Sequence, residues 1–306
     1  MEIRNAATGA LEGTWRIESI GADGKTVVLA ADGASVPTVD EGDRWQGVYR
    51  FDEYTVKGDV EVVSVDPIRV YSEQVITGTV ETDAIYADRL VIKPNAVLTQ
   101  KLTPSSAAPE SLRIEVRELV VEAGGTIDVS SRGYPAGQTY PGHAMPSTGH
   151  GGSHLGEGGS NPLDGGRGET FGSVYFPREN GGASVYVRGG GAVQVVAERA
   201  VIDGVIRADG QSGCRGGAGG SVWVKTLELS GTGTIEAKGG TQSCGGGSGG
   251  GGAIAVEYTR LAAGTTLLEH LVATGGDNGY QGGAGTVYVR GGRAATYGHL
   301  IVDNKA

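Results

Sequence analysis

Cysteine, methionine, phenylalanine and long apolar runs are scarce in this sequence. Its 306 residues include two cysteines, two methionines, three phenylalanines and ten prolines. No apolar run approaches the roughly 18 residues of a membrane-spanning helix, so we expect no membrane span. The first residues also lack the apolar stretch of a signal peptide. An exported chain would therefore have lost its signal or would form part of a larger chain.

Basic residues are also in the minority. The chain has 25 lysines and arginines against 35 aspartates and glutamates, which gives a formal net charge of −10. Binding to nucleic-acid phosphates needs a concentrated basic surface, and no such cluster occurs here. We therefore expect no nucleic-acid partner.

Glycine, by contrast, is abundant, at 57 residues, whereas an average protein contains roughly 7%. The glycines do not recur at every third position and proline is rare, which excludes collagen. They alternate with compact apolar runs such as Val222 to Val224 and Val287 to Val289, a pattern that disfavours disorder. We interpret the glycines as turns between strands.

The second half of the chain is repetitive. Segments that begin at Ala192, Ser221, Ala253 and Thr286 read alike and start 29, 32 and 33 residues apart. Each reads as a strand, a turn, a second strand and a glycine loop, and units of this size bury their apolar face by stacking. A β-propeller is the structural alternative, but its repeat is nearer 40 to 45 residues with antiparallel hairpins.

Two earlier units, in residues 85–99 and 112–129, bring the total to about six coils. The pattern predicts an all-β protein: a right-handed parallel β-helix (solenoid) over residues 79–306, with a long loop excursion at about 134–182. Residues 1–78 contain less glycine and a hairpin pattern, so we predict a small N-terminal β cap there.

Stacking predicts which residues become neighbours on successive coils. Lys225, Glu257 and Arg290 should share one outward row. Asp128, Arg207 and Glu236 should occupy equivalent positions in the second strand of their units, as should residues 301–303 in the last unit. Opposite charges at such positions stabilise a sheet modestly.

Several segments together carry a resemblance to a known kind of protein. They are residues 13–20, 47–52, 119–134, 204–210, 282–289 and 300–304. In this order they resemble the glycine-rich β-helix segments of very large bacterial secreted or cell-surface proteins. The resemblance implies a structural or adhesive role, with a polysaccharide or another surface protein as the partner. It implies no catalytic residue and no cofactor.

The two cysteines occupy equivalent loops. Cys214 follows Ala208 by six residues and Cys244 follows Ala237 by seven, so stacking brings them onto adjacent coils. The distance between stacked coils is within the range that a disulfide spans, and we predict a Cys214–Cys244 bond. Two free thiols are the alternative. A disulfide would favour an oxidising, extracellular or cell-surface location.

Aromatic and basic residues recur in three similar tetrapeptides. The aromatic members are Tyr186, Trp223 and Tyr288, and the basic members are Arg188, Lys225 and Arg290. If all point outward, the rings could stack on sugars and the cations could attract acidic groups of a polysaccharide. The alternative is a cross-strand row that neighbouring loops cover.

The long excursion contains three of the five histidines, His143, His150 and His154, with Glu157 and Asp164 nearby. Imidazole and carboxylate groups could hold a divalent metal there. Their spacing matches no metal motif, however, and solvated loop histidines explain the pattern equally.

Parallel β-helices also support enzymes that cleave polysaccharides with paired carboxylates. The candidate carboxylates are Asp128, Asp203, Asp209, Glu236 and Asp277. The sequence singles out no pair among them, so no residue is assigned as catalytic. Three hypotheses remain: a structural or adhesive module, a carbohydrate-binding module, and a polysaccharide lyase or glycoside hydrolase.

Overall fold

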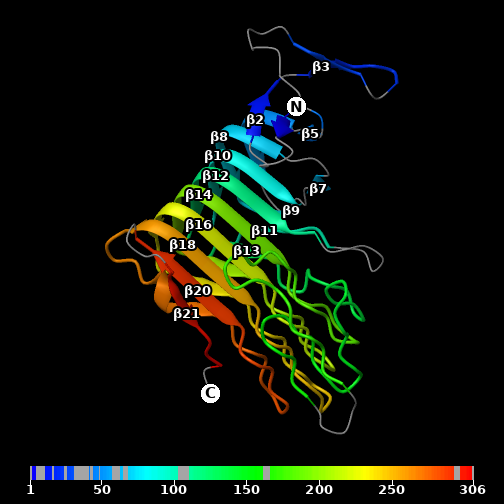
Figure 1. Cartoon of the computed structure of the whole chain (residues 1–306). Helices are drawn as coiled ribbons and strands as arrows, with labels where there is room; N and C mark the ends of the chain where they lie inside the picture. The colour runs from blue at the N-terminus through cyan, green and yellow to red at the C-terminus, as the bar shows by residue number, and fades with distance from the viewer. Residues whose placement is uncertain are drawn as a thin grey trace.

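The protein is a stack of coils built from two parallel sheets. The computed structural model describes residues 2–4, 11–15, 17–23, 26–30, 41, 44–47, 49–56, 63–64, 68–102, 110–160, 166–292 and 297–304. Within these residues the fold is all-β, and the strands of the two large sheets lie in register along the stack (Figure 1). This arrangement is a β-solenoid.

Each coil gives a long strand to the first sheet and a short strand to the second. The first sheet has nine strands, in spatial order β6 (Tyr49–Val56), β8 (Ile68–Ile76), β10 (Ala84–Ile92), β12 (Leu112–Val121), β14 (Ala192–Ile202), β16 (Ser221–Ser230), β18 (Ala253–Leu261), β20 (Thr286–Gly291) and β21 (His299–Ile301). The second has seven, β7 (Val63–Ser64), β9 (Thr79–Thr82), β11 (Val97–Thr99), β13 (Thr126–Asp128), β15 (Val205–Arg207), β17 (Thr234–Glu236) and β19 (Leu271–Val272). The 3-10 helix η1 (Leu267–Glu269) precedes β19.

The register confirms the predicted stacking. Ala192, Ser221, Ala253 and Thr286 are direct partners on β14, β16, β18 and β20. Strand β12 pairs in parallel with β14 over its whole length, although the excursion separates them in sequence. The excursion therefore leaves the stack and returns without disturbing it.

The core lies between the two sheets and consists of aliphatic side chains. Along the first sheet, Ile114, Val195 and Val224 occupy one inward row, and along the second, Ile127 and Ile206 occupy another. All five are fully buried. Burial of such a side chain contributes about 1.5–3 kcal/mol, so each added coil extends one continuous apolar core.

The stack begins earlier in the chain than the sequence pattern suggests. Strands β6 and β8 lie within the range 1–78 that we assigned to a cap, yet they pair in parallel with each other, and β8 pairs in parallel with β10. Antiparallel strands precede them, namely β2-β1-β5 (Leu11–Thr14, Glu2–Arg4, Arg44–Gln46) and the hairpin of β3 (Ile17–Ile20) and β4 (Val27–Leu29). In that hairpin the Asp23 carboxylate accepts a hydrogen bond from the Thr26 backbone N–H at 3.0 Å, as a turn aspartate does.

The placement of residues 301–303 in a second-sheet strand is wrong. Strand β21 instead folds back and pairs antiparallel with β20, where Ile301 is the partner of Val287. The β20 edge would otherwise present unpaired N–H and C=O groups, and β21 satisfies them. Just beyond it, the Asn304 side chain accepts a hydrogen bond from the Gly275 N–H at 2.8 Å and donates one to the Gly282 carbonyl at 2.9 Å.

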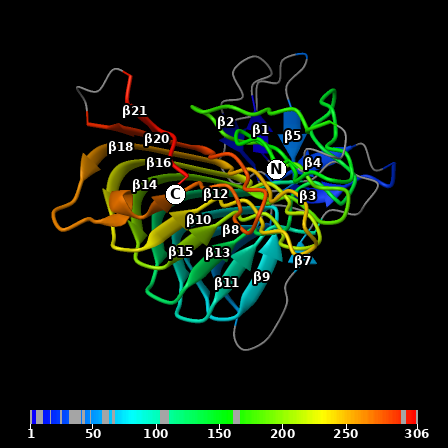
Figure 2. The ribbon, with the colours of Figure 1, turned by 90° about the horizontal axis from the view of Figure 1, so that it is seen from below.

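Glycine-rich segments form a third layer of the protein, which we call the glycine bundle. It comprises residues 149–160, 180–191, 208–220, 237–252 and 273–285. The segments connect short strands to the next long strands or belong to the excursion, and they gather at one side of the two sheets (Figure 2). They run side by side as extended chain outside the two sheets.

Backbone hydrogen bonds join these segments with a three-residue repeat. The N–H groups of Gly216 and Gly219 donate to the carbonyls of Gly247 and Gly250 at 3.1 and 2.9 Å. Gly247 and Gly250 in turn donate to residues 149 and 152, both at 2.9 Å. A left-handed polyproline II chain has three residues per turn and no internal hydrogen bonds, so its backbone groups are available to neighbouring chains in this way.

The interpretation of the glycines as turns is therefore wrong for the bundle. Among the glycines of its segments only Gly245 and Gly279 have a positive φ, and both lie at hairpin tips. Elsewhere glycine is required by close approach: a Cβ atom on Gly249 would lie 1.9 Å from the Gly217 carbonyl oxygen, and one on Gly282 would lie 1.9 Å from that of Gly249. The segments pack backbone against backbone, as collagen chains do at their axis.

Candidate functional site

A groove lies on the outer face of the first sheet. Its central part has a volume of 450 Å³ and lies over β14, β16, β18 and β20, between Val196, Leu227 and Arg290. A second hollow of 230 Å³ continues it and shares Glu257 and Arg290 with it. A third of 340 Å³ adjoins through Glu198 and Leu227. Together we call them the outer groove.

Aromatic side chains form one end of the outer groove. Trp223 and Tyr288 lie in one outward row with Ala255 between them, as the strand alternation predicts. Both are nevertheless buried, because the excursion returns over them: Phe176 packs edge-on against Trp223 with ring centroids 5.7 Å apart, and Tyr175 packs against Tyr288 at 5.0 Å. The row is thus covered, and the covering rings are themselves exposed, Tyr175 by 57% and Phe176 by 51%.

Charged groups line the floor of the groove. The predicted row of Lys225, Glu257 and Arg290 is confirmed by the pairing of β16, β18 and β20. Glu257 is buried, accepts a hydrogen bond from the Trp223 indole N–H at 3.0 Å and forms an ion pair with Arg290. Lys225 is exposed and has no ion pair with another described residue, and the same is true of Glu198 on the neighbouring coil.

Tyr186 and Arg188 lie elsewhere. The residue beside Trp223 on β14 is Gln194, and Tyr186 lies outside the strands, at a bend within the segment 180–191 of the glycine bundle. Arg188 donates to the Gly133 carbonyl at 3.3 Å and lines a separate hollow with Tyr186. The tetrapeptide around Tyr186 resembles the strand sequences, but the glycines on both of its sides place it at a hairpin tip.

The aromatic cover of the groove did not emerge from the sequence. Tyr175 and Phe176 belong to the excursion, where no repeat assigns a neighbour to a residue. The one available signal was an apolar run, Val174 to Phe176, in a segment otherwise poor in large side chains. Val174 packs on the cluster of Trp223 and Tyr288.

The three excursion histidines occupy different environments. His143 is half-buried and contacts the Phe171 ring, whereas His150 and His154 are buried. The Nδ1–H of His154 donates to the Gly219 carbonyl at 2.9 Å, and its Nε2 is buried without a hydrogen-bond partner among the described residues. No group of three or more histidine, cysteine, aspartate or glutamate side chains in the described ranges is placed to hold a metal ion. Asp164, named with the histidines, lies outside those ranges.

The candidate carboxylates have electrostatic and turn contacts. Asp128, Arg207 and Glu236 occupy one row of the second sheet, as predicted, and Arg207 donates to Glu236 at 3.1 Å. Asp209, next to them, accepts a hydrogen bond from the Lys238 backbone N–H at 2.7 Å. Asp203, in the turn between β14 and β15, accepts a hydrogen bond at 3.0 Å from the N–H of Thr232 in the equivalent turn of the next coil.

Asp277 also has a local role in the bundle. Its carboxylate accepts a hydrogen bond from the Asn278 backbone N–H at 2.7 Å, and its own carbonyl accepts one from the Ser248 hydroxyl at 2.8 Å. These bonds fix the tip of a glycine hairpin.

Two buried groups give the folding free energy an opposing pH dependence. Burial lowers the pKa of His154 to about 4, so stability is lost as the pH falls from the ordinary histidine value toward 4. Burial raises the pKa of Asp209 to about 6, although Lys238 pulls it down. The folded state therefore binds a proton at Asp209 before the unfolded chain does, and stability is gained between pH 6 and the ordinary aspartate value of 3.8.

An Asp209→Asn variant should reveal this balance. Asparagine keeps an acceptor for the Lys238 N–H but removes the titration. We expect the unfolding free energy of the native protein, relative to that of the variant, to rise by about 2.4 kcal/mol between pH 7 and pH 4. Denaturant unfolding at a series of pH values measures it, with Asp277→Asn as an exposed control. Parallel curves for the native protein and Asp209→Asn would contradict the assignment.

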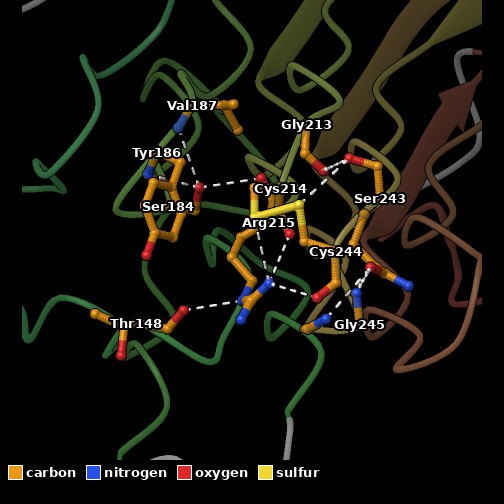
Figure 3. The surroundings of a disulfide bond; sticks show 12 residues. Thr148, Ser184, Tyr186, Val187, Gly213, Cys214, Arg215, Ser243, Cys244 and Gly245 are labelled. Carbon is orange, nitrogen blue, oxygen red and sulfur yellow. Dashed lines mark hydrogen bonds between the residues drawn. A yellow bond between two sulfur atoms is a disulfide. The ribbon is translucent and has the colours of Figure 1, made fainter.

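The predicted Cys214–Cys244 disulfide is confirmed. The bond joins the tips of two successive bundle hairpins, with Cα atoms 4.7 Å apart and the cysteines 30 positions apart in sequence. Arg215 lies beside it and donates hydrogen bonds to the carbonyls of Thr148 at 2.9 Å and Cys244 at 3.3 Å (Figure 3). The disulfide and Arg215 together fasten the excursion to the next two coils.

A further electrostatic row on the first sheet is missing from the sequence predictions. It runs along β8, β10, β12, β14, β16 and β18 with strictly alternating sign: Glu73, Arg89, Glu118, Arg199, Glu228 and Arg260. Each neighbouring pair forms an ion pair, for example Arg89 with Glu118 at 2.7 Å and Arg260 with Glu228 at 3.0 Å. The excursion between Glu118 and Arg199 hides this alternation in the linear sequence.

Comparisons with known proteins identify no relative. No protein-family model, curated protein or solved structure matches the chain. Among the described residues, no helix combines the length and apolar character needed to cross a bilayer.

Proposed function

We propose that this chain is a secreted or cell-surface structural and adhesive module, built as a right-handed parallel β-helix and without catalytic activity of its own. The hand is the one that strand crossovers adopt almost without exception. The resemblance to glycine-rich segments of large bacterial surface proteins supports the same role.

The observation that carries the proposal is the disulfide-linked glycine bundle. Its segments satisfy one another through backbone hydrogen bonds, and the Cys214–Cys244 bond fastens the tips of two of its hairpins. Disulfides persist in oxidising surroundings such as the cell exterior. A protease must bind several residues of extended chain in its active site. A segment that is hydrogen-bonded to its neighbours can be cleaved only after it unfolds locally.

Proteolysis tests the structural part of the proposal. The 25 lysines and arginines offer many sites for trypsin. We expect prolonged digestion of the native, oxidised chain to leave a fragment that contains all coils from β8 to β21, as mass spectrometry would show. Rapid cleavage within the bundle, at Arg215 or Lys238 for example, would contradict the proposal.

A product assay tests the absence of catalysis. Incubation with a panel of acidic and neutral polysaccharides is expected to release no reducing ends and no unsaturated sugars. Product that depends on the folded chain would select the enzyme hypothesis instead.

A further inference from the structure

We propose that the outer groove binds an extended acidic glycan, with Lys225 and Arg290 facing the carboxylates of the sugars and Tyr175 and Phe176 facing the sugar rings. This site goes beyond the structural role and does not depend on it. It also differs from the set that sequence reasoning selected, because Trp223 and Tyr288 are buried and Tyr186 lies in another hollow.

The shape of the groove suits a chain-like ligand. Three adjoining hollows of 230, 450 and 340 Å³ share lining residues, so the depression continues from the aromatic end to the alternating charges of the first sheet. Sites for small ligands span about 300–1,000 Å³. A run of several sugar units fits such an elongated surface better than one compact molecule does.

The chemistry of the aromatic half favours sugars with carboxylates. Sugar rings have apolar C–H faces that stack on aromatic rings, and Tyr175 and Phe176 present two exposed rings side by side in sequence. Three cations lie close to them: Arg290 and Lys225 line the groove, and Arg178 lies over the Trp223 ring at 5.3 Å. The buried Glu257 neutralises one of these charges and Glu198, which also lines the central hollow, offsets a second, so this half keeps an excess of one positive charge in a protein of net charge −10.

The supports of the groove are rigid. Glu257 is held by the Trp223 indole and by Arg290, and both residues stand on strands whose backbone is paired on each side. Ligand contacts on such elements are pre-organised and lose little entropy on binding. The paired strands also leave no free edge on the groove floor, so an extended peptide cannot bind there by adding a strand.

Calorimetric titration of the native, oxidised chain with oligogalacturonate of four to six sugars tests the proposal. Neutral cello-oligosaccharides of the same length are the comparison. We expect the acidic chain to bind at least about tenfold more tightly, with an affinity that falls as salt is added. Absence of binding by the acidic oligosaccharide, or equal binding of the neutral one, would overturn the proposal.

Matched variants locate the site. Lys225→Met and Tyr175→Ala should each weaken binding by about tenfold, because each removes one class of contact. Lys93→Met removes a lysine that lies outside the groove and pairs with Glu122, and Tyr186→Ala removes an exposed tyrosine from the other hollow. Both should bind as the native chain does. Loss of binding in Tyr186→Ala but not in Tyr175→Ala would overturn the placement.

Circular dichroism and thermal unfolding of each variant exclude a folding defect as the cause. These four side chains are exposed or half-buried, so we expect all variants to fold. The result is also separable from the structural proposal, since resistance to trypsin needs no ligand.

Discussion

Replacement of Gly249 by alanine is expected to destabilise the protein by more than about 3 kcal/mol. A Cβ atom there would lie 1.9 Å from the Gly217 carbonyl oxygen and 2.4 Å from its carbon. Separating the two segments would also strain the hydrogen bond that joins them, from the Gly240 N–H to the same Gly217 carbonyl, now 2.8 Å long. Overpacking alone costs 1–3 kcal/mol, and lost buried hydrogen bonds add to it.

A graded series makes the prediction specific. Alanine at Gly283 would place its Cβ atom 3.2 Å from the nearest atom, and alanine at Gly166 would meet nothing within 4 Å. We therefore expect Gly283→Ala to lose less stability than Gly249→Ala, and Gly166→Ala to stay within about 0.5 kcal/mol of the native protein. Denaturant unfolding of the three variants measures the order. Equal effects at Gly249 and Gly166 would show that the segments are not in close contact.

The glycine bundle explains why glycine is so common here although it lowers the stability of regular elements. Glycine loses more backbone freedom on folding than any other residue, by about 0.5–1 kcal/mol relative to alanine in a regular element. In the bundle this loss is offset by backbone hydrogen bonds that side chains would prevent. Buried segments would otherwise leave N–H and C=O groups unsatisfied, which is more costly still.

Removal of the disulfide is expected to lower the unfolding free energy by about 3–4 kcal/mol. The bond closes a loop of about 30 residues, and the entropy that it removes from the unfolded chain gives this magnitude. Denaturant unfolding of a Cys214→Ser/Cys244→Ser variant measures the loss. We expect the melting temperature to fall as well.

The effect of a reductant on stability is the control for this prediction. Dithiothreitol should lower the stability of the native chain toward that of the double variant and should leave the double variant unchanged. Native stability that does not respond to full reduction, verified by thiol titration, would show that the neighbouring hydrogen bonds of Arg215 and Ser243 hold the hairpin tips without the bond.

Stacking rules allowed much of the fold to be predicted. Alternating valines at a constant spacing define which residues pair, so the register of β14, β16, β18 and β20 followed directly from the sequence. The cysteine pairing followed from the same spacing. These predictions were confirmed because residues one repeat apart in sequence become neighbours on successive coils of a parallel stack.

The wrong predictions concern segments whose position in the fold the sequence repeat does not determine. Residues 301–303 have a strand pattern in either sheet, and only the exposed edge of β20 decides their position. Tyr186 lies in a strand-like tetrapeptide, but its flanking glycines belong to the bundle. The bundle itself has no side-chain pattern, because its specificity resides in backbone groups that every residue has.

The candidate site was predicted only in part. The outward row of Lys225, Glu257 and Arg290 follows from the register, whereas its cover by Tyr175 and Phe176 depends on the path of the excursion. That path is fixed by close packing of glycines far apart in the chain, and a single sequence gives no measure of it.

The uninterrupted pairing of β12 with β14 has a consequence for how such a protein can change in evolution. The intervening excursion adds whole hairpins to the corner of one turn while the strands on either side keep their partners. The bundle interface is made of backbone groups, so an inserted segment needs no complementary side chains to pack on it. It only needs residues small enough for close backbone approach. Insertions of small residues at this corner can thus enlarge the molecule sideways without a redesign of its interior.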